Sequence, residues 1–468
     1  MENILYKLSS GDTICALATP AGMGAIAMVR ISGKDSFSIV GNVFSPFRSS
    51  SSLLEAKGYT ILHGKIGKNE ILDEVLINVF RAPHSYTGED LLEISCHGSV
   101  FIQRKLIELL ISEGARLADR GEFTLRAFMN GKFDLSQAEA VADLIISSTS
   151  TSHELAIRQM RGGYSSKIAG LRKQLVDFAS LLELELDFSE EDVEFADRTR
   201  FRALVAEISE EIASLMSSFR LGNVLKSGIP VAIIGKPNVG KSTLLNALLN
   251  EEKAIVSEIP GTTRDYIEDV MVIRGVSFRF IDTAGLRHSE DTIESLGIER
   301  TYEQIRQARV ILYVFDLAET GVDELKILID ELKNNAEDSG KEFIPVVNKT
   351  DLLVESPHHF AALSEMDAIY ISAKRKENIN LIIERLLNSV DFGKLEDSTI
   401  ISSSRHFDAL EKSSVAISAV SEGLNTGLPT DLIAAELRRA LYFLGEITGE
   451  VTTNELLGNI FSRFCIGK

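Results

Sequence analysis

Short apolar runs separated by turn residues dominate the first 120 positions of the chain. Five runs have the length and composition of strands: Thr13–Leu17, Ile26–Ile31, Tyr59–Gly64, Leu72–Arg81 and Leu91–Cys96. The segment Val100–Ser112 has the pattern of a helix. This mixture predicts an α+β domain, which we place at residues 1–122.

Helical spacing takes over in the next part, where no proline occurs between Pro83 and Pro230. One apolar seam has a 3-4-3-4 spacing and is formed by Ile168, Leu171, Leu175, Phe178 and Leu182. Such spacing places the five side chains on one face of a helix. Because the seam is short, we favour a helix packed in a bundle over a free coiled coil.

Strand and helix patterns alternate from about residue 228 to residue 390. The strand segments are Val231–Ile234, Ser277–Ile281, Val310–Phe315, Phe343–Val347 and Ala368–Ile371. Alternation of this kind predicts a mostly parallel sheet that is covered on both faces. We therefore expect an α/β domain at residues 226–392.

The chain returns to helical spacing after residue 400, with an apolar face formed by Ile433, Leu437, Leu441 and Leu444. A helical tail of about 70 residues would be marginally stable alone, so we expect it to pack on the helices before residue 225. This predicts one discontinuous all-α domain, made of residues 123–225 and 393–468. The α/β domain is then inserted between its two parts.

Composition narrows the class of protein. The chain has 468 residues and a formal net charge of −19, so bulk electrostatics should not hold nucleic acid. Its cysteines, Cys15, Cys96 and Cys465, lie far apart in the sequence. This argues against a disulfide framework or a zinc site and fits a reducing cytoplasm. Because no segment resembles a membrane span or a signal peptide, we expect a cytoplasmic protein without a membrane partner.

The segment Gly235–Ser242, with the sequence GKPNVGKS, follows a predicted strand. A strand, a glycine-containing loop and a helix form a phosphate-binding loop, in which backbone N–H groups surround the phosphates. Lys241 adds a positive charge at the β- and γ-phosphates, and Ser242 offers its hydroxyl to Mg²⁺.

Three further segments point to a guanine nucleotide. Asp282–Gly285 (DTAG) follows an apolar strand, where Asp282 can hold Mg²⁺ through water. Asn348–Asp351 (NKTD) follows another strand, and the Asp351 carboxylate can accept both N–H donors on the edge of guanine, which adenine lacks. Ser372–Lys374 (SAK) follows the last strand and can contact the base.

A switch segment belongs between the phosphate-binding loop and Asp282. Gly261–Asp265 lies there, and Thr263 can close on Mg²⁺ when a γ-phosphate is present. Leu286 stands where many regulatory GTPases have a glutamine that orients the attacking water. Glu294 is our candidate for that task, although the residues alone favour an ordinary solvated carboxylate at a helix start.

Segments along the whole chain resemble the MnmE (TrmE) family of tRNA-modification GTPases. The matching segments are Asp12–Ile14, Ala18–Gly22, Val29–Gly33, Tyr86–Asp90, Gly121–Phe128, Lys132–Ala140, Gly261–Asp265 and Phe464–Lys468. A generic GTPase would match only the middle of the chain, so agreement at both ends makes the resemblance specific.

The resemblance implies a tetrahydrofolate-binding and dimerisation domain, a helical domain in two segments and an inserted GTPase domain. It implies a homodimer that acts with the flavoprotein MnmG on C5 of the wobble uridine of certain tRNAs, adding an aminomethyl or carboxymethylaminomethyl group. The one-carbon unit comes from 5-formyl- or methylene-tetrahydrofolate. The folate contacts that the resemblance carries over are Arg30, Glu93, Lys132 and Lys468, and Cys465 is a candidate for a role near the folate.

The resemblance also implies a GTPase that K⁺ stimulates when two GTPase domains pair. The K⁺ ligands are the side chain of Asn238 and backbone groups near Ser257, Ile259 and Thr262, and Glu294 orients the water. The predicted GTP site comprises Asn238, Val239, Gly240, Lys241, Ser242, Thr243, Ser257, Thr262, Thr263, Asp282, Thr283, Ala284, Gly285, Asn348, Lys349, Asp351, Ser372, Ala373 and Lys374. Ser242 and Thr263 are the predicted Mg²⁺ ligands.

Two other functions use the same nucleotide motifs. A GTPase switch in ribosome assembly or RNA folding would need no modification chemistry, but it should carry a basic RNA-binding module, and this acidic chain shows none. A folate-dependent transferase with a decayed GTPase is disfavoured because every nucleotide motif is intact.

Overall fold

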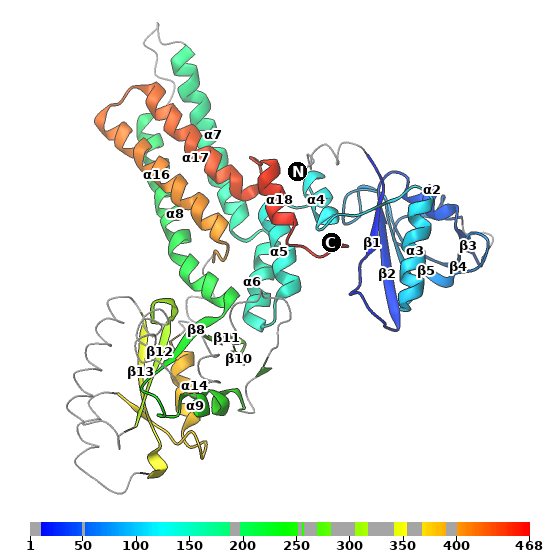
Figure 1. Cartoon of the computed structure of the whole chain (residues 1–468). Helices are drawn as coiled ribbons and strands as arrows, with labels where there is room; N and C mark the ends of the chain where they lie inside the picture. Colours follow the sequence, from blue (N-terminus) through cyan, green and yellow to red (C-terminus); the bar gives the residue numbers. More distant parts are fainter. Residues whose placement is uncertain are drawn as a thin grey trace, which may run out of the picture. The chain divides into compact units, whose positions relative to one another are not determined.

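The computed structural model describes residues 11–48, 52–187, 197–250, 255–256, 269–281, 305–316, 341–352, 367–389 and 400–468 (Figure 1). The chain forms two compact units. The first comprises Met1–Ile146, Ala156–Glu210 and Ala409–Lys468, and the second comprises Ser147–Leu155 and Glu211–Asp408. The predicted domain boundaries divide the chain more finely and stay predictions.

A seven-stranded sheet lies in the N-terminal part of the first unit. In sheet order its strands are β3 (Phe44–Pro46), β4 (Thr60–Ile66), β5 (Asp73–Phe80), β6 (Leu91–His97), β2 (Ile26–Ser32), β1 (Ile14–Leu17) and β7 (Arg116–Leu117). Only β1 and β7 pair in parallel. The five predicted strands and the helix α3 (Val100–Ser112) are confirmed. The additional elements β3, β7 and α2 (Ser36–Gly41) are too short to set a periodicity in the sequence.

One face of this sheet is the core of the α+β part. Val29 and Ile31 of β2 and Ile94 of β6 are buried there, in one cluster. Because side chains alternate along a strand, the residues between them point to the opposite face. The register of β2 and β6 pairs Arg30 with Glu93 on that opposite face.

Helices make up the rest of the first unit. The helices with all their residues in it after α3 are α4 (Glu122–Met129), α5 (Leu135–Ile146), α7 (Gly163–Asp187), α17 (Thr430–Thr448) and α18 (Asn454–Phe461). Three helices have residues in both units: α6 (Ser150–Met160), α8 (Arg198–Ser227) and α16 (Ser404–Thr426).

The predicted apolar seam is buried along α7. Helix α17 packs along α7, and its residues Ile433, Leu437 and Leu444 are buried (Figure 1). The C-terminal helices therefore pack on an earlier helix, as predicted. The seam belongs to a helix bundle, as we expected from its short length.

Apolar contacts also hold the end of the chain. Phe461 and Phe464 lie in one buried cluster with Leu125 of α4 and Leu135 of α5. This cluster fixes the start of the segment 464–468 beside α4.

Helix α5 begins with a reciprocal cap. The backbone N–H of Gln137 donates to Asp134 Oδ1 (2.8 Å), and the backbone N–H of Asp134 donates to Gln137 Oε1 (3.0 Å). Ser165 Oγ donates to the other carboxylate oxygen of Asp134 (2.7 Å). Such a cap satisfies N–H groups that have no partner within the helix. Part of the family-matching segment Lys132–Ala140 is thus a helix start.

The second unit contains another seven-stranded sheet. In sheet order its strands are β14 (Ile369–Tyr370), β13 (Glu342–Asn348), β12 (Val310–Asp316), β8 (Ile229–Ile234), β11 (Val276–Phe280), β10 (Asp269–Ile273) and β9 (Ile255–Val256). The first five run parallel to one another, which confirms the predicted mostly parallel sheet. Strands β10 and β9 add an antiparallel edge that the sequence analysis did not predict.

Both faces of this sheet are buried. Ile233 of β8 and Leu312 of β12 enter one apolar cluster, which also contains residues of α9 (Lys241–Leu249) and α14 (Ile379–Asn388). Ile234 and Tyr313, the next residues along the same strands, enter a second cluster on the other face. Among the described residues, no helix is both long enough and apolar enough to cross a membrane.

Candidate functional site

The phosphate-binding loop connects β8 to α9 in the second unit. Gly240 is the residue before α9 and has a left-handed backbone with φ of 96°. A Cβ atom at Gly240 would lie 2.3 Å from Asn348 Nδ2, so only glycine fits here. Asn238 also has a positive φ, 63°, and its side chain is exposed. The loop therefore has the tight backbone that a phosphate cradle requires.

Lys241 is the first residue of α9 and points back over the loop. Its Nζ donates to the carbonyl oxygens of Gly235 (2.8 Å) and Lys236 (2.7 Å). Burial lowers the pKa of Lys241 because it disfavours the charged ammonium. A phosphate at this position would offset that cost by supplying the opposite charge.

Asn348, the last residue of β13, joins two loops. Its Nδ2 donates to the carbonyl oxygen of Val239 in the phosphate-binding loop (2.8 Å). Its Oδ1 accepts a hydrogen bond from the backbone N–H of Ala373 (3.0 Å). Asn348 is buried, so its carboxamide is a fixed link between the phosphate-binding loop and the SAK segment.

Asp351 is held by the SAK segment. Ser372 Oγ donates to Asp351 Oδ1 (2.7 Å), and the same hydroxyl accepts a hydrogen bond from the backbone N–H of Arg375 (3.2 Å). The hydrogen bond from Ser372 is the chief cause that lowers the pKa of Asp351, with nearby positive charge adding to it. A carboxylate that stays ionised can accept both N–H donors of guanine.

Lys349 belongs to an ion pair that the sequence analysis missed. Its Nζ lies 2.9 Å from Asp316 Oδ2, and Asp316 is buried at the end of β12. The register of β12 and β13 places Asp316 directly beside Asn348. An aspartate at the end of a parallel strand next to the NKTD strand was the available signal.

Other predicted residues of the nucleotide site have simpler placements. Ser242 and Thr243 lie in the first turn of α9, and Lys374 is exposed after Ala373. The remaining predicted GTP, K⁺ and water-orienting residues lie outside the described residues: Ser257, Ile259, Thr262, Thr263, Asp282, Thr283, Ala284, Gly285 and Glu294. Their roles stay predictions.

Metal binding in this region would rest on few protein groups. Within the described residues, no group of three or more His, Cys, Asp or Glu side chains could hold a metal ion. The predicted Mg²⁺ ligands are instead the hydroxyls of Ser242 and Thr263, and the predicted K⁺ ligands are the carboxamide of Asn238 and backbone groups near Ser257, Ile259 and Thr262. Oxygen donors of this kind suit these hard cations when phosphate oxygens complete the ligand set.

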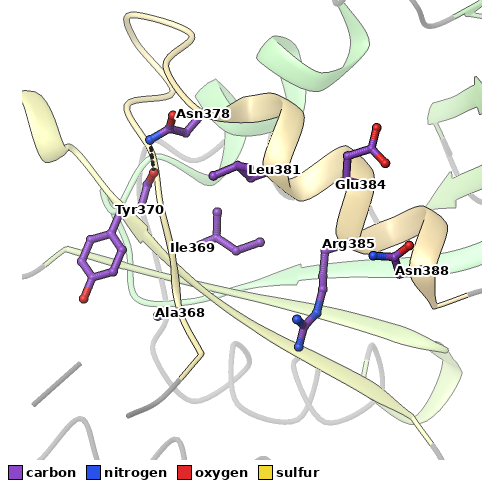
Figure 2. A pocket seen from close by; sticks show the side chains of 8 residues that line it. All are labelled: Ala368, Ile369, Tyr370, Asn378, Leu381, Glu384, Arg385 and Asn388. Carbon is purple, nitrogen blue, oxygen red and sulfur yellow. Dashed lines mark hydrogen bonds between the residues drawn. The ribbon is translucent and has the colours of Figure 1, made fainter. Parts of the chain in front are cut away.

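A cavity of about 390 Å³ lies beside the edge strand β14 and the helix α14 (Figure 2). Ile369 and Leu381 give it an apolar side, while Asn378 and Arg385 add polar groups. Asn378 Nδ2 donates to the carbonyl oxygen of Tyr370 (2.9 Å). None of the predicted nucleotide-site residues lines this cavity.

The first unit contains a separate cluster of charged groups. Arg30 Nε and one terminal nitrogen donate to Glu93 Oε1 at 3.0 and 2.7 Å, and the other terminal nitrogen donates to the carbonyl oxygen of Gly467 (3.3 Å). Burial lowers the pKa of Lys468, and the charge of Arg30 lowers it further. The structure therefore brings together three of the four predicted folate contacts.

The fourth predicted contact makes a different interaction. Lys132 is exposed, and its Nζ donates to the carbonyl oxygen of Pro83 (3.0 Å). Cys465 is exposed in the same tail as Lys468, while Cys15 and Cys96 are buried. The folate roles of these residues stay predictions.

Gly467 is at a point of close approach between the tail and the sheet. Its φ is 94°, and a Cβ atom there would lie 2.2 Å from the carbonyl oxygen of Leu17. No larger residue fits without moving the backbone. This glycine lets the tail come close enough for its carbonyl to reach Arg30.

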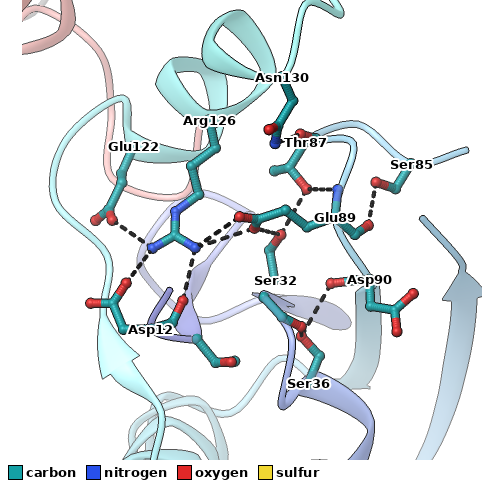
Figure 3. Close-up of polar contacts among 12 residues, drawn as sticks. Asp12, Ser32, Ser36, Ser85, Thr87, Glu89, Asp90, Glu122, Arg126 and Asn130 are labelled. Atoms are coloured by element: carbon teal, nitrogen blue, oxygen red, sulfur yellow. Dashed lines mark hydrogen bonds and ion pairs between the residues drawn. The ribbon is translucent and has the colours of Figure 1, made fainter. Parts of the chain in front are cut away.

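A buried ion network lies around the start of α4 (Figure 3). The guanidinium of Arg126 contacts Asp12 (2.7 Å), Glu89 (3.2 Å) and Glu122 (3.0 Å), and only 4% of its side chain is exposed. Arg116 contacts the same Asp12 (2.7 Å) and Glu122 (2.6 Å). Pairing of this kind compensates the cost of burying charge.

Comparisons with known proteins agree along the whole chain. Residues 13–132 match the family model described as GTP-binding protein TrmE N-terminus, and residues 135–465 match the MnmE helical domain. Proteins named tRNA modification GTPase MnmE are 53% identical over 465 residues in Flavobacterium johnsoniae and 51% over 461 in Flavobacterium psychrophilum. The relative of that name in Bacteroides fragilis is 50% identical over 466 residues. Each alignment covers 98% of this chain and 99% of the relative. Since about half of the residues are identical over nearly the whole length of each chain, the chain belongs to the MnmE (TrmE) family of tRNA modification GTPases.

Proposed function

We propose that this chain binds and hydrolyses GTP as part of a tRNA-modification system. The observation that carries the proposal is the double hydrogen bond of Asn348, which joins the phosphate-binding loop at Val239 to the base-reading segment at Ala373. Asp351 lies in the same assembly through Ser372. One ligand with phosphates at one end and guanine at the other satisfies both parts.

In this proposal each residue has a separate task. Lys241 exchanges its hydrogen bonds with loop carbonyls for bonds to phosphate oxygens, which neutralises charge on the leaving phosphates. Asp351 selects guanine, because its ionised carboxylate would be left unpaired by adenine. Glu294 orients the attacking water, since Leu286 has no polar group.

Cations complete the proposed nucleotide site. Mg²⁺, held by Ser242 and Thr263, would neutralise the charge that develops on the phosphates. Asn238, Ser257, Ile259 and Thr262 would hold K⁺, which would stimulate hydrolysis when two GTPase domains pair. The exposed carboxamide of Asn238 on the phosphate-binding loop supports this assignment.

We also propose that the chain acts as a homodimer with the flavoprotein MnmG on the wobble uridine of tRNA. A tetrahydrofolate derivative would bind at Arg30, Glu93, Lys132 and Lys468 and supply the one-carbon unit. The juxtaposition of a carboxylate with two cations supports this, because a pterin offers N–H donors and its glutamate tail offers carboxylates.

The direct test is reconstitution of the full chain with its flavoprotein partner, tRNA, GTP and a methylene donor folate. Mass spectrometry of the wobble uridine should show the added group only when all components are present. Full GTP turnover with unmodified uridine would contradict the proposal and favour a GTPase switch in ribosome assembly or RNA folding.

The cation role has its own test. Phosphate release should be at least about tenfold faster in KCl than in NaCl, since an arginine finger in the same place is worth about 10³–10⁵ in rate. Asn238→Gly removes the side-chain ligand and keeps the positive φ accessible, so it should abolish the difference. Equal rates of the unmodified chain in both salts would exclude the cation role.

A further inference from the structure

The side chain of Lys349 reaches the carboxyl end of the neighbouring strand β12. Lys349 follows β13, and its Nζ lies 2.9 Å from Oδ2 of Asp316, the last residue of β12. In the sheet, β12 lies between β13 and β8, and β8 leads into the phosphate-binding loop. The ammonium of Lys349 therefore lies between the base-reading side and the phosphate side of the site, where a nucleotide that spans both would place its sugar.

The phosphate-binding loop also lies against strand β12. A Cβ atom at Gly235, the first residue of this loop, would lie 2.0 Å from the carbonyl oxygen of Val314 in β12. Asp316 is two residues further along β12 and is paired in register with Asn348. The end of β12 thus contacts the phosphate-binding loop and also carries the partner of Lys349.

The backbone of Lys349 is fixed on both sides. Lys349 has a φ of 62°, which a residue with a side chain rarely adopts. Asn348 before it is held by the two hydrogen bonds of its carboxamide, and the backbone N–H of Thr350 after it donates to the carbonyl oxygen of Ile371 (3.2 Å). With Nζ paired to Asp316, both ends of the Lys349 side chain have defined positions.

Asp316 is a buried carboxylate, with 7% of its side chain exposed, whereas 28% of the Lys349 side chain is exposed. A buried ion pair adds little net stability relative to apolar residues of similar size. Stability alone therefore does not account for an aspartate at this strand end. The pair does have an electrostatic consequence, because it compensates the charge of Lys349 next to the phosphate-binding loop.

We propose that Asp316 is a positioning residue, which holds the Lys349 side chain across the nucleotide site so that its methylene stem supports the sugar and the base. Asp316 itself does not contact the ligand. Its carboxylate also compensates the ammonium of Lys349, which leaves Lys241 in the phosphate-binding loop to meet the phosphates. This inference rests on the proposed GTP role of the second unit, and it assigns a task to a residue that lies outside the nucleotide motifs.

Asp316→Asn tests this task, because it keeps the shape of the side chain and removes its charge. In steady-state GTP hydrolysis by the full chain, KM should rise about tenfold for a lost charge-assisted contact, while kcat should change less than about threefold. A fall in kcat with an unchanged KM would overturn the inference, because Asp316 would then act on the chemical step.

Asp367→Asn is the matched control. Asp367 is an exposed aspartate of the same unit that pairs with Arg385. It precedes β14 and so lies at the amino end of that strand, whereas the nucleotide motifs follow carboxyl ends. KM and kcat should both stay within about twofold of the unmodified chain.

Lys349→Met separates positioning from a purely structural role, because it keeps an unbranched stem and removes the ammonium. Calorimetry measures GDP binding in a double-mutant cycle. Asp316→Asn should weaken binding about tenfold in the unmodified chain but less than about twofold in the Lys349→Met background. An equal loss in both backgrounds would overturn the inference, since Asp316 would then act without Lys349.

The cycle stays decisive if Asp316→Asn alone fails to fold, as thermal unfolding would reveal. The double variant Asp316→Asn/Lys349→Met has no unpaired buried charge at this position, and it should bind GDP at least as tightly as Lys349→Met. Binding about tenfold weaker than that of Lys349→Met would overturn the inference. Absence of GDP binding to the unmodified chain would instead refute the proposed GTP role and with it this refinement.

Discussion

The two candidate sites are built in opposite ways. In the second unit, the nucleotide site uses loops that follow the parallel strands β8, β13 and β14 of one sheet. In the first unit, the Arg30 site uses side chains of two antiparallel strands 63 positions apart, together with a carbonyl group 437 positions from Arg30. Short sequence motifs therefore predict the nucleotide site, whereas the Arg30 site depends on contacts between residues that are far apart in the sequence.

The electrostatics differ in the same way. Lys241 is bound to backbone carbonyls, which leave its charge uncompensated until a phosphate arrives. Arg30, Arg116 and Arg126 are already paired with carboxylates. Lys241 is thus available to pair with a phosphate, whereas these three arginines already have carboxylate partners.

The largest expected effect is a loss of stability in the first unit, from a change that lies outside the nucleotide site of the second unit. Arg126→Met leaves three carboxylates around a neutral side chain, which should cost about 3–5 kcal/mol of unfolding free energy. Urea unfolding followed by circular dichroism measures this, with Arg104→Met as the exposed control, expected within about 0.5 kcal/mol. A cost under about 1 kcal/mol for Arg126→Met would show that the network does not hold this part of the molecule.

The converse change should affect only the nucleotide site. Lys241→Ala removes the ammonium that faces the phosphates, so GTP turnover should fall by roughly 10²–10³-fold. Binding of 5-formyltetrahydrofolate should stay unchanged because the Arg30 site is built separately. Phosphate release and calorimetry measure the two properties. A parallel loss of folate affinity would contradict the independence of the sites.

A smaller effect on nucleotide binding is expected when the hydrogen bonds of Asn348 inside the nucleotide site are removed. Asn348→Ala leaves the backbone N–H of Ala373 without its buried partner, which should cost about 1–3 kcal/mol. We expect nucleotide affinity to fall about tenfold, as measured by titration with a fluorescent GDP analogue. Asn388→Ala, an exposed change on α14, is the control. Unchanged affinity in Asn348→Ala would mean that the link is dispensable.

The smallest effect is a pH dependence of the buried network. Burial tends to raise the pKa of Asp12, but hydrogen bonds and charges from Arg116 and Arg126 outweigh it and lower the pKa below 3.8. Because the folded pKa is depressed, the ionised Asp12 stabilises the protein above pH 3.8, and this contribution is lost as pH falls through the folded value.

Asp12→Asn tests this sign. The variant should be less stable than the unmodified chain by about 0.5–1 kcal/mol at pH 6, allowing for solvent screening. The difference should shrink as the pH is lowered below 3.8. Urea unfolding at several pH values measures it, and a difference that grows on acidification would have the wrong sign.

The sequence predicts the nucleotide site in more detail than the Arg30 site. The motifs of Lys241, Asn348 and Asp351 follow strands that periodicity alone predicts, so their convergence at one edge of a parallel sheet was predictable. The side-chain links between them, such as Asn348 to Val239, depend on packing that no local pattern encodes. The pair of Lys349 with Asp316 was missed for the same reason.

The Arg30 site could be predicted only through family resemblance. The pairing of Arg30 with Glu93 requires the register of β2 and β6, and the contact with Gly467 requires the path of the tail. Apolar alternation gives the faces of the strands but not their partners. The cap formed by Asp134 and Gln137 has a local signal, an acceptor followed three residues later by glutamine, but the sequence analysis did not use it.

The central claim is that Asp351 makes the second unit a guanine site. Asp351→Asn replaces an acceptor by a group that can donate to the additional oxygen of xanthine, so the measurement is kcat/KM for GTP and for XTP. We predict that the value for GTP falls at least about 100-fold while the value for XTP rises above it. Retained preference for GTP, or an equal loss of both activities, would contradict the account.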